Sequence, residues 1–210
     1  MINMKNYVIN IGRELGSGGR AIGKILAEKR SLKYYDKELI NIAAQKSGLS
    51  KEFFEKADEN ADHNVGGGIF GLRFPFYPTD IMNNNVLNNE NLFKIQSDVV
   101  KELVENDSCL FVGRCTDYIL RDNPNCVNVF ITADKKDRIT QIMENYEISA
   151  EKAEELMIRT DKKRAAFYNY YSLKTWGAAK SYHLCINSST LGIEKTVEFI
   201  DHYIDLKLKK

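Results

Sequence analysis

The residues best suited to chemistry lie between positions 7 and 27, where the sequence reads YVINIGRELGSGGRAIGKILA. An apolar run of strand type comes first, a turn holding four glycines within residues 12–19 follows, and an amphipathic helical pattern comes last. Glycine permits positive φ and close approach of backbone N–H groups to an anion, and a helix N terminus adds a favourable dipole. The segment therefore predicts a phosphate-binding loop.

Two phosphate-binding motifs compete for these residues. Read from Gly16, GSGGRA fits the dinucleotide pattern G-x-G-x-x-A, with Asp36 twenty residues further on. In that motif the glycine turn follows its strand almost directly, whereas residues 12–15 intervene here. A P-loop needs about that many residues to curl around a phosphate, so the spacing favours a P-loop. A plain turn without a ligand is disfavoured, because four glycines cost conformational entropy with no gain in packing.

The elements that must position this loop follow from hydrophobic patterning. Apolar or β-branched runs without clean alternation predict parallel strands buried on both faces, at residues 7–11, 33–36, 109–112, 127–132 and 182–187. Helical patterns separate them, at residues 19–30, 37–47, 50–57, 88–105, from 134 onward, 149–171 and 192–208. Strands that alternate with helices predict a doubly wound α/β sheet.

Composition limits the class of protein. The chain has 210 residues, with 43% hydrophobic and 28% charged side chains and a formal net charge of +1, as expected for one globular domain that is not a general nucleic-acid binder. No apolar run approaches the roughly 18 residues of a membrane span, and the first residues lack a signal-peptide core. We therefore expect a cytoplasmic protein. Four scattered cysteines and three distant histidines predict reduced thiols and no metal-ligating cluster.

Residues 11–26 resemble the pattern I-D-G-P-A-G-S-G-K-S-T-x-A-K-x-L of the bacterial cytidylate kinases, which belong to the P-loop nucleoside-monophosphate kinases. The match has no gaps and holds at Gly16, Ser17, Gly18, Lys24 and Leu26. The form R-E-[FL]-G-S-G-G-R is typical of a cytidylate-kinase-like subgroup. The resemblance implies that the phosphates contact Arg13, Gly16, Ser17, Gly18, Gly19, Arg20 and Ala21.

Three departures from the family pattern concern chemistry. Arg13 stands at the first Walker glycine, Gly19 at the Walker lysine, and Arg20 at the Ser or Thr that binds Mg²⁺. The lysine neutralises charge on the β- and γ-phosphates during transfer. Arg13, Arg20 or Lys24 could supply that charge instead. Arg20, in the first turn of the helix, is the best candidate from sequence, and we expect it to be catalytic.

Acceptor residues are also implied by the resemblance. The segment VGRCTDYIL at 112–120 is similar to the family's Gly-Arg element, which places Arg114 at the acceptor, with Asp117 close enough to replace the family's Asp. Asp36 falls on the Asp of the family's L-D-S-G-x-x-Y-R element, although Asn41 and Ile42 replace its Tyr-Arg pair. An arginine fork suits a phosphate or a pyrimidine edge.

A basic helix lies in the C-terminal half. Arg159 and Arg164 align with the family's R-D-x-x-D-x-x-R lid helix, and Asp161 lies between them. The resemblance implies that both arginines clamp the transferred phosphoryl group, while a solvated basic face is the alternative. The aromatic side chains that follow are expected in the core or on a dimer surface rather than in a nucleic-acid site: Phe167, Tyr168, Tyr170, Tyr171 and Trp176.

Together these features predict a three-layer P-loop NTPase fold with a five-stranded parallel sheet and a helical lid. We expect a single domain over 1–210, with a mobile acceptor-side excursion at about 50–88 and a lid at about 134–180. The expected function is transfer of phosphate from ATP, with Mg²⁺, to CMP or a similar small acceptor, without nucleic-acid or membrane partners and with a homodimer possible. The alternatives are a nucleotide-binding regulatory module without catalysis and, less favoured, an NAD(P)-dependent oxidoreductase.

Overall fold

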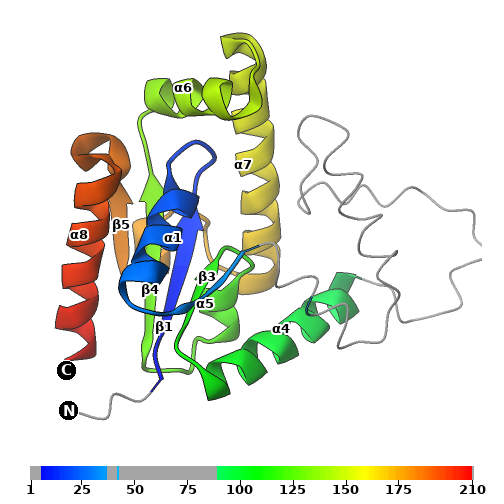
Figure 1. Cartoon of the computed structure of the whole chain (residues 1–210). Coiled ribbons are helices and arrows are strands. Elements are labelled where there is room, and N and C mark those ends of the chain that lie inside the picture. Colours follow the sequence, from blue (N-terminus) through cyan, green and yellow to red (C-terminus); the bar gives the residue numbers. More distant parts are fainter. Residues whose placement is uncertain (1–5, 37–41, 43–88, 210) are drawn as a thin grey trace, which may run out of the picture.

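Five short strands form one parallel sheet in the order β2-β3-β1-β4-β5 (Figure 1). They are β1 (Val8–Arg13), β2 (Lys33–Tyr35), β3 (Cys109–Val112), β4 (Cys126–Thr132) and β5 (Leu184–Asn187). In this computed structural model the described residues are 6–36, 42 and 89–209. The predicted five-stranded parallel sheet is confirmed, and all four strand pairings are parallel.

Helices cover both faces of the sheet, as continuous apolar strands require. Helices α1 (Gly19–Lys29) and α8 (Ser188–Leu208) pack on one face, and α4 (Asn89–Asn106) and the short α5 (Thr116–Ile119) lie against the other (Figure 1). Helices α6 (Lys135–Tyr146) and α7 (Ala150–Ser172) stand at the end of the sheet to which the strands point (Figure 1). Both lie within residues 134–180, the range predicted for the lid.

Alternation along β1 divides the core. Ile9 and Ile11 are fully buried against α1 and α8, whereas Val8 faces α4 and α5. Asn10 also points to the second face, where its amide donates to Oδ1 of Asn128 on β4 at 2.8 Å. The sheet therefore buries polar side chains on the face that packs against α4 and α5.

Local signals place most helix ends. The Ser149 side chain caps α7 by accepting from Lys152 N–H, as expected for a helix that begins at Ser149. Helix α8 begins four residues before its predicted start, with the Asn187 side chain as its cap. Gly192 interrupts that helix with φ 74° and ψ 173°, so the regular part begins after Gly192.

One helix of the structure was missed by the sequence analysis, and some predicted elements lie outside the described residues. Helix α5 was not predicted. The predicted helices at 37–47 and 50–57 and the excursion at about 50–88 lie outside the described residues, apart from residue 42. In the parts of the chain that the structure describes, no helix is long and apolar enough to cross a membrane.

Candidate functional site

The glycine loop leaves β1 at Arg13 and enters α1 at Gly19. Gly16 has φ 79°, and a Cβ there would lie 2.5 Å from the carbonyl oxygen of Arg138. Gly18 caps α1 in the left-handed region, with no side-chain hydrogen bond at the cap. The first N–H groups of a helix have no partner within the helix, and no side chain accepts from them at the cap here. The N terminus of α1 therefore suits an anion. The loop has the backbone that phosphate binding requires.

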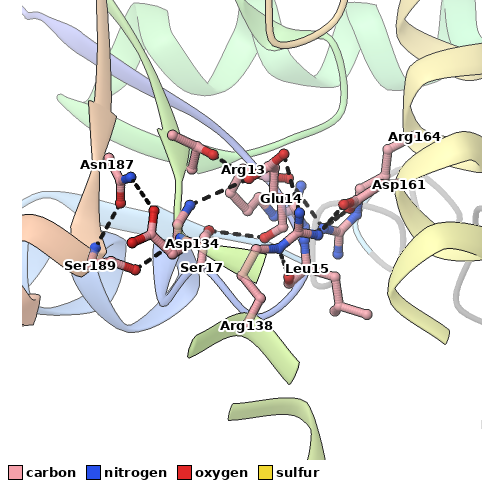
Figure 2. Close-up of polar contacts among 12 residues, drawn as sticks. Arg13, Glu14, Leu15, Ser17, Asp134, Arg138, Asp161, Arg164, Asn187 and Ser189 are labelled. Carbon is pink, nitrogen blue, oxygen red and sulfur yellow. Dashed lines mark hydrogen bonds and ion pairs between the residues drawn. The ribbon is translucent and has the colours of Figure 1, made fainter. Parts of the chain in front are cut away.

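Helices α6 and α7 hold the first half of the loop (Figure 2). Asp161 on α7 accepts a hydrogen bond from the Leu15 N–H at 2.9 Å, and Arg138 on α6 donates through Nε to the Leu15 carbonyl at 2.7 Å. Arg138 also pairs with Glu14 at 3.2 Å and directly with Asp161. The loop and the two helices are thus one polar network.

Arg164 brings a buried cation from α7 to the end of β1. Its Nη1 donates to the Arg13 carbonyl at 3.2 Å and lies 3.7 Å from Oδ1 of Asp161. Burial, reinforced by Arg13 nearby, lowers the pKa of Arg164 to about 9. Burial raises the pKa of Asp161, although Arg138 and Arg164 oppose that rise. Cations that repel one another in a buried site favour an anionic ligand.

Arg13, Arg20 and Asp36 meet at the carboxyl edge of the sheet. Nε of Arg20 lies 2.6 Å from Oδ2 of Asp36, and Nη2 of Arg13 lies 3.6 Å from Oδ1 of Asp36. The Arg13 side chain is buried, and burial lowers its pKa, whereas 57% of the Arg20 side chain is exposed. A predicted acceptor residue therefore contacts two predicted phosphate-binding residues.

The Gly-Arg element follows β3 on the same edge. Gly113 borders the Arg13 guanidinium, and Arg114 is buried with φ 67°, its carbonyl accepting from Gln96 at 3.1 Å. Asp117 is also buried, and its Oδ2 accepts from the Tyr168 hydroxyl at 2.7 Å. Burial raises the pKa of Asp117, and burial together with Asp117 raises that of Tyr168.

A small cavity of about 30 Å³ lies between the ends of β1 and β3, α5 and α7. Its walls include Arg13, Asp117 and Tyr168. Three buried side-chain atoms on its lining residues lack a hydrogen-bond partner among the described residues: Asn10 Oδ1, Arg164 Nε and Tyr182 OH. Buried polar groups without partners are rare, and a cavity of this size admits a water or one polar group of a ligand. The cavity therefore offers polar groups to a ligand beside the end of β1, where the glycine loop begins.

The remaining predicted residues take different places. Ser17 is buried, with its hydroxyl donating to the Glu14 carbonyl at 2.9 Å, and Ala21 is exposed on α1. Arg159 is exposed on α7. Within the described ranges, no group of three or more His, Cys, Asp or Glu side chains could hold a metal ion.

Sequence reasoning missed Arg138, which contacts both Glu14 and Leu15 of the loop. Its partners are 123 residues away at Leu15 and 23 residues away at Asp161, so local pattern did not identify it. One signal was present. Arg138 lies in the first turn of the helix that follows β4, at the carboxyl edge where ligands collect in open α/β sheets.

The fold and loop define the class of protein. A dinucleotide-binding sheet places its second strand beside the first, whereas β3 lies between β2 and β1 here. The dinucleotide interpretation of GSGGRA therefore does not fit, and the chain has the P-loop kinase fold.

The chain belongs to the cytidylate kinase-like family, whose profile matches residues 8–190. It is similar to an uncharacterized protein from Eubacterium ventriosum ATCC 27560, with 28% identity and a TM-score of 0.69 over 95% of this chain and 99% of that one. Two shikimate kinases share the fold. The enzyme from Bacteroides thetaiotaomicron has a TM-score of 0.53 at 13% identity, over 95% of this chain and 98% of its own. The one from Acinetobacter baumannii, in complex with shikimate, has 0.51 at 13%, over 96% and 94%. No curated protein matches the chain in sequence.

Proposed function

We propose that the protein transfers the γ-phosphoryl group of ATP to a nucleoside monophosphate, CMP-like by family resemblance, or to a similar small acceptor. The observation that carries this proposal is that Arg13, Arg20 and Arg164 lie close to the glycine loop, which leads into a helix with no side-chain cap at its N terminus. Phosphoryl transfer needs little covalent chemistry from a protein, and positioned positive charge supplies most of the catalysis.

The residues then have distinct parts in the reaction. The loop amides from Gly16 to Ala21 hold the phosphates, and Arg164 and Arg159 of α7 stabilise the charge that develops on the transferred group. Arg114, Asp117 and Asp36 face the acceptor. The bond between the γ-phosphorus and the β–γ bridging oxygen breaks, and a bond to an acceptor oxygen forms. The departing group is ADP, and the acceptor proton, where there is one, passes to solvent or a nearby carboxylate.

Mg²⁺ is expected with ATP, because kinases of this fold use it to neutralise the phosphates. The loop offers Arg20 where the metal-binding hydroxyl of a Walker loop stands. Asp36 pairs with two arginines, and Asp117 with Tyr168. The residues present therefore fit the phosphates better than the ion, and the ion would enter held chiefly by the nucleotide.

A second function is favoured by one specific observation. Arg20, which takes the position of the Walker hydroxyl, is engaged with Asp36 at 2.6 Å. A protein that kept the cradle and lost the chemistry would bind nucleotide and regulate a partner without turnover.

One experiment separates the two. Purified protein is incubated with Mg-ATP and a panel of acceptors that includes CMP, other nucleoside monophosphates, shikimate and simple sugars, and ADP formation and product mass are followed. ADP with one phosphorylated acceptor supports the kinase. Tight ATP binding without turnover supports the regulatory module, and the absence of ATP binding to folded protein contradicts both.

A further inference from the structure

The Arg13 side chain occupies the space that a side chain at residue 19 would need. A Cβ placed on residue 19 would lie 2.6 Å from Cβ and 3.1 Å from Cγ of Arg13, closer than side-chain atoms pack. Residue 19 is the Walker-lysine position, and residue 13 is the first Walker glycine. The first carbon atoms of the Arg13 side chain thus fill the space that the Cβ of a lysine at residue 19 would take. Both side chains cannot be present unless the loop shifts.

The Arg13 side chain continues from there to the far side of the loop. Its guanidinium reaches the end of β3, where any Cβ on Gly113 would collide with Nη1. Nη2 lies 3.6 Å from Asp36, just after β2. The charge therefore sits between the phosphate loop and the edge of the sheet that carries the predicted acceptor residues. Two glycines, 19 and 113, leave room for it.

The surrounding charges leave this site positive. The ion pairs that enclose the loop join four arginines, Arg13, Arg20, Arg138 and Arg164, to three carboxylates, Glu14, Asp36 and Asp161. Asp36 makes its close contact with Arg20 rather than with Arg13. Keeping a buried arginine charged is costly unless an anion compensates it. A bound phosphate supplies that anion.

We propose that Arg13 is the residue that replaces the Walker lysine: it brings the phosphate-neutralising charge from the first position of the loop, and Gly19 is the space that this exchange requires. Arg20 then holds Asp36 in place and does not contact the phosphate. This inference rests on the proposed function, because it names the cation of the same site. An arginine fork can bind two phosphate oxygens at once, so the exchange changes the geometry of recognition and keeps its charge.

The test uses the whole chain of 210 residues and six variants, one of which is Arg20→Ala. Arg13→Gln removes the charge and keeps the length, and Arg13→Lys keeps the charge. Arg13→Gly and Gly19→Lys each make half of the exchange, and the double variant Arg13→Gly/Gly19→Lys rebuilds the standard Walker arrangement. Mg-ATP affinity is measured by calorimetry, ADP formation by a coupled assay, and folding by thermal denaturation.

We expect the single variants to weaken ATP binding and the double variant to restore it. Arg13→Gln and Arg13→Gly weaken ATP binding by roughly 10- to 100-fold, as expected for loss of hydrogen bonds to a charged group, and Arg13→Lys recovers part of this loss. Gly19→Lys alone lowers the melting temperature and weakens binding, because its side chain meets Arg13. The double variant binds ATP within about tenfold of the wild type, an effect that a merely structural role for Arg13 does not produce.

Other outcomes overturn the inference in distinguishable ways. ATP affinity that is unchanged in folded Arg13→Gln overturns this assignment while the proposed function stands. A large loss in Arg20→Ala with none in Arg13→Gln assigns the cation to Arg20 and also overturns it. Failure of the folded wild type to bind ATP overturns the proposed function, and this inference with it.

Discussion

The Leu15 N–H donates to Oδ1 of Asp161 at 2.9 Å, joining the phosphate loop to a helix 146 residues further along the chain. In a P-loop the backbone amides are the groups that hold phosphate, so a carboxylate on one of them bears directly on the site. The same carboxylate pairs with Arg138 and lies 3.7 Å from Arg164. Asp161 therefore couples the position of α7 to the conformation of the loop.

Replacement of Asp161 by Asn should destabilise the protein and weaken its binding of ATP. The amide still accepts from Leu15, but Arg138 and Arg164 lose their shared counter-charge while both remain largely buried. Because Asp161 is about one-sixth exposed, we expect the free energy of unfolding to fall by roughly 2 to 4 kcal/mol. Urea denaturation measures the change.

The chain offers a matched control in Glu154, which pairs with Lys135 on the surface between the same two helices. Glu154→Gln should cost less than about 1 kcal/mol, because exposed ion pairs contribute little. Equal losses in the two variants would contradict the view that the Asp161 network is special.

A methyl group at Gly16 should disrupt the loop. Gly16→Ala combines a positive φ of 79° with contact between the new Cβ and the backbone of Arg138, at 2.5 Å from its carbonyl oxygen. We expect a loss of roughly 2 to 4 kcal/mol in the free energy of unfolding, together with reduced ATP affinity.

Gly192 separates the two causes. It has a similar φ of 74°, but nothing lies within 4 Å of a Cβ at that position. Gly192→Ala therefore adds no steric contact, and its loss of stability measures backbone strain alone, at a φ and ψ that are essentially restricted to glycine. A Gly16→Ala protein with unchanged stability and affinity would show that the loop can move away from α6.

The sheet was predictable because its strands are short runs of mainly apolar or β-branched residues without strict alternation. Residues 109–112 were predicted with the observed bounds of β3, and the helix predicted at 149–171 corresponds to α7, Ala150–Ser172. Helix α5 was not, because it follows two residues in the left-handed region, Arg114 and Cys115, whose types do not signal that conformation.

The site was predictable only in its local part. Sequence located the loop and the two buried arginines, Arg13 and Arg164, but not the contacts among them. Pairing Asp36 with Arg13 and Arg20 depends on how β2, β3 and β1 lie side by side, and no local pattern carries that order. Sequence also did not show that a Cβ at residue 19 would collide with the Arg13 side chain, because that depends on the path of the loop between them.

Stability should depend on pH through Asp117. Burial raises its pKa in the folded protein above the unfolded value, so the folded state binds the proton more readily between the two values. Its contribution to stability is therefore greatest below the unfolded pKa and falls as the pH rises through the folded pKa. Asp117→Asn removes this titration and still accepts from Tyr168.

The difference between wild type and Asp117→Asn is the quantity to measure. Urea denaturation at pH 4 and pH 7 should show the variant gaining on the wild type at the higher pH. A difference that is the same at both values would mean that Asp117 titrates normally in the folded protein.

Two tyrosines of the cavity should respond oppositely to loss of their hydroxyl groups. Tyr168 donates to Asp117 at 2.7 Å, whereas the buried Tyr182 hydroxyl lacks a hydrogen-bond partner among the described residues. Tyr168→Phe should therefore cost about 1 to 3 kcal/mol, because it leaves a buried carboxylate without its partner. Tyr182→Phe should be neutral or slightly stabilising in the ligand-free protein, since it removes an unsatisfied buried group.

Ligand reverses the expectation for Tyr182. If the cavity receives a polar group of the acceptor, Tyr182→Phe raises the KM for that acceptor and leaves ATP affinity unchanged. Thermal denaturation without ligand checks the effect on stability, and calorimetry with Mg-ATP and a coupled ADP assay check the affinity and the KM. Tyr170→Phe is the control, because Tyr170 is 64% exposed on the same helix as Tyr168. A stability loss in Tyr182→Phe as large as that in Tyr168→Phe would show that the Tyr182 hydroxyl is already satisfied, and the cavity would then lose one of its three free polar groups.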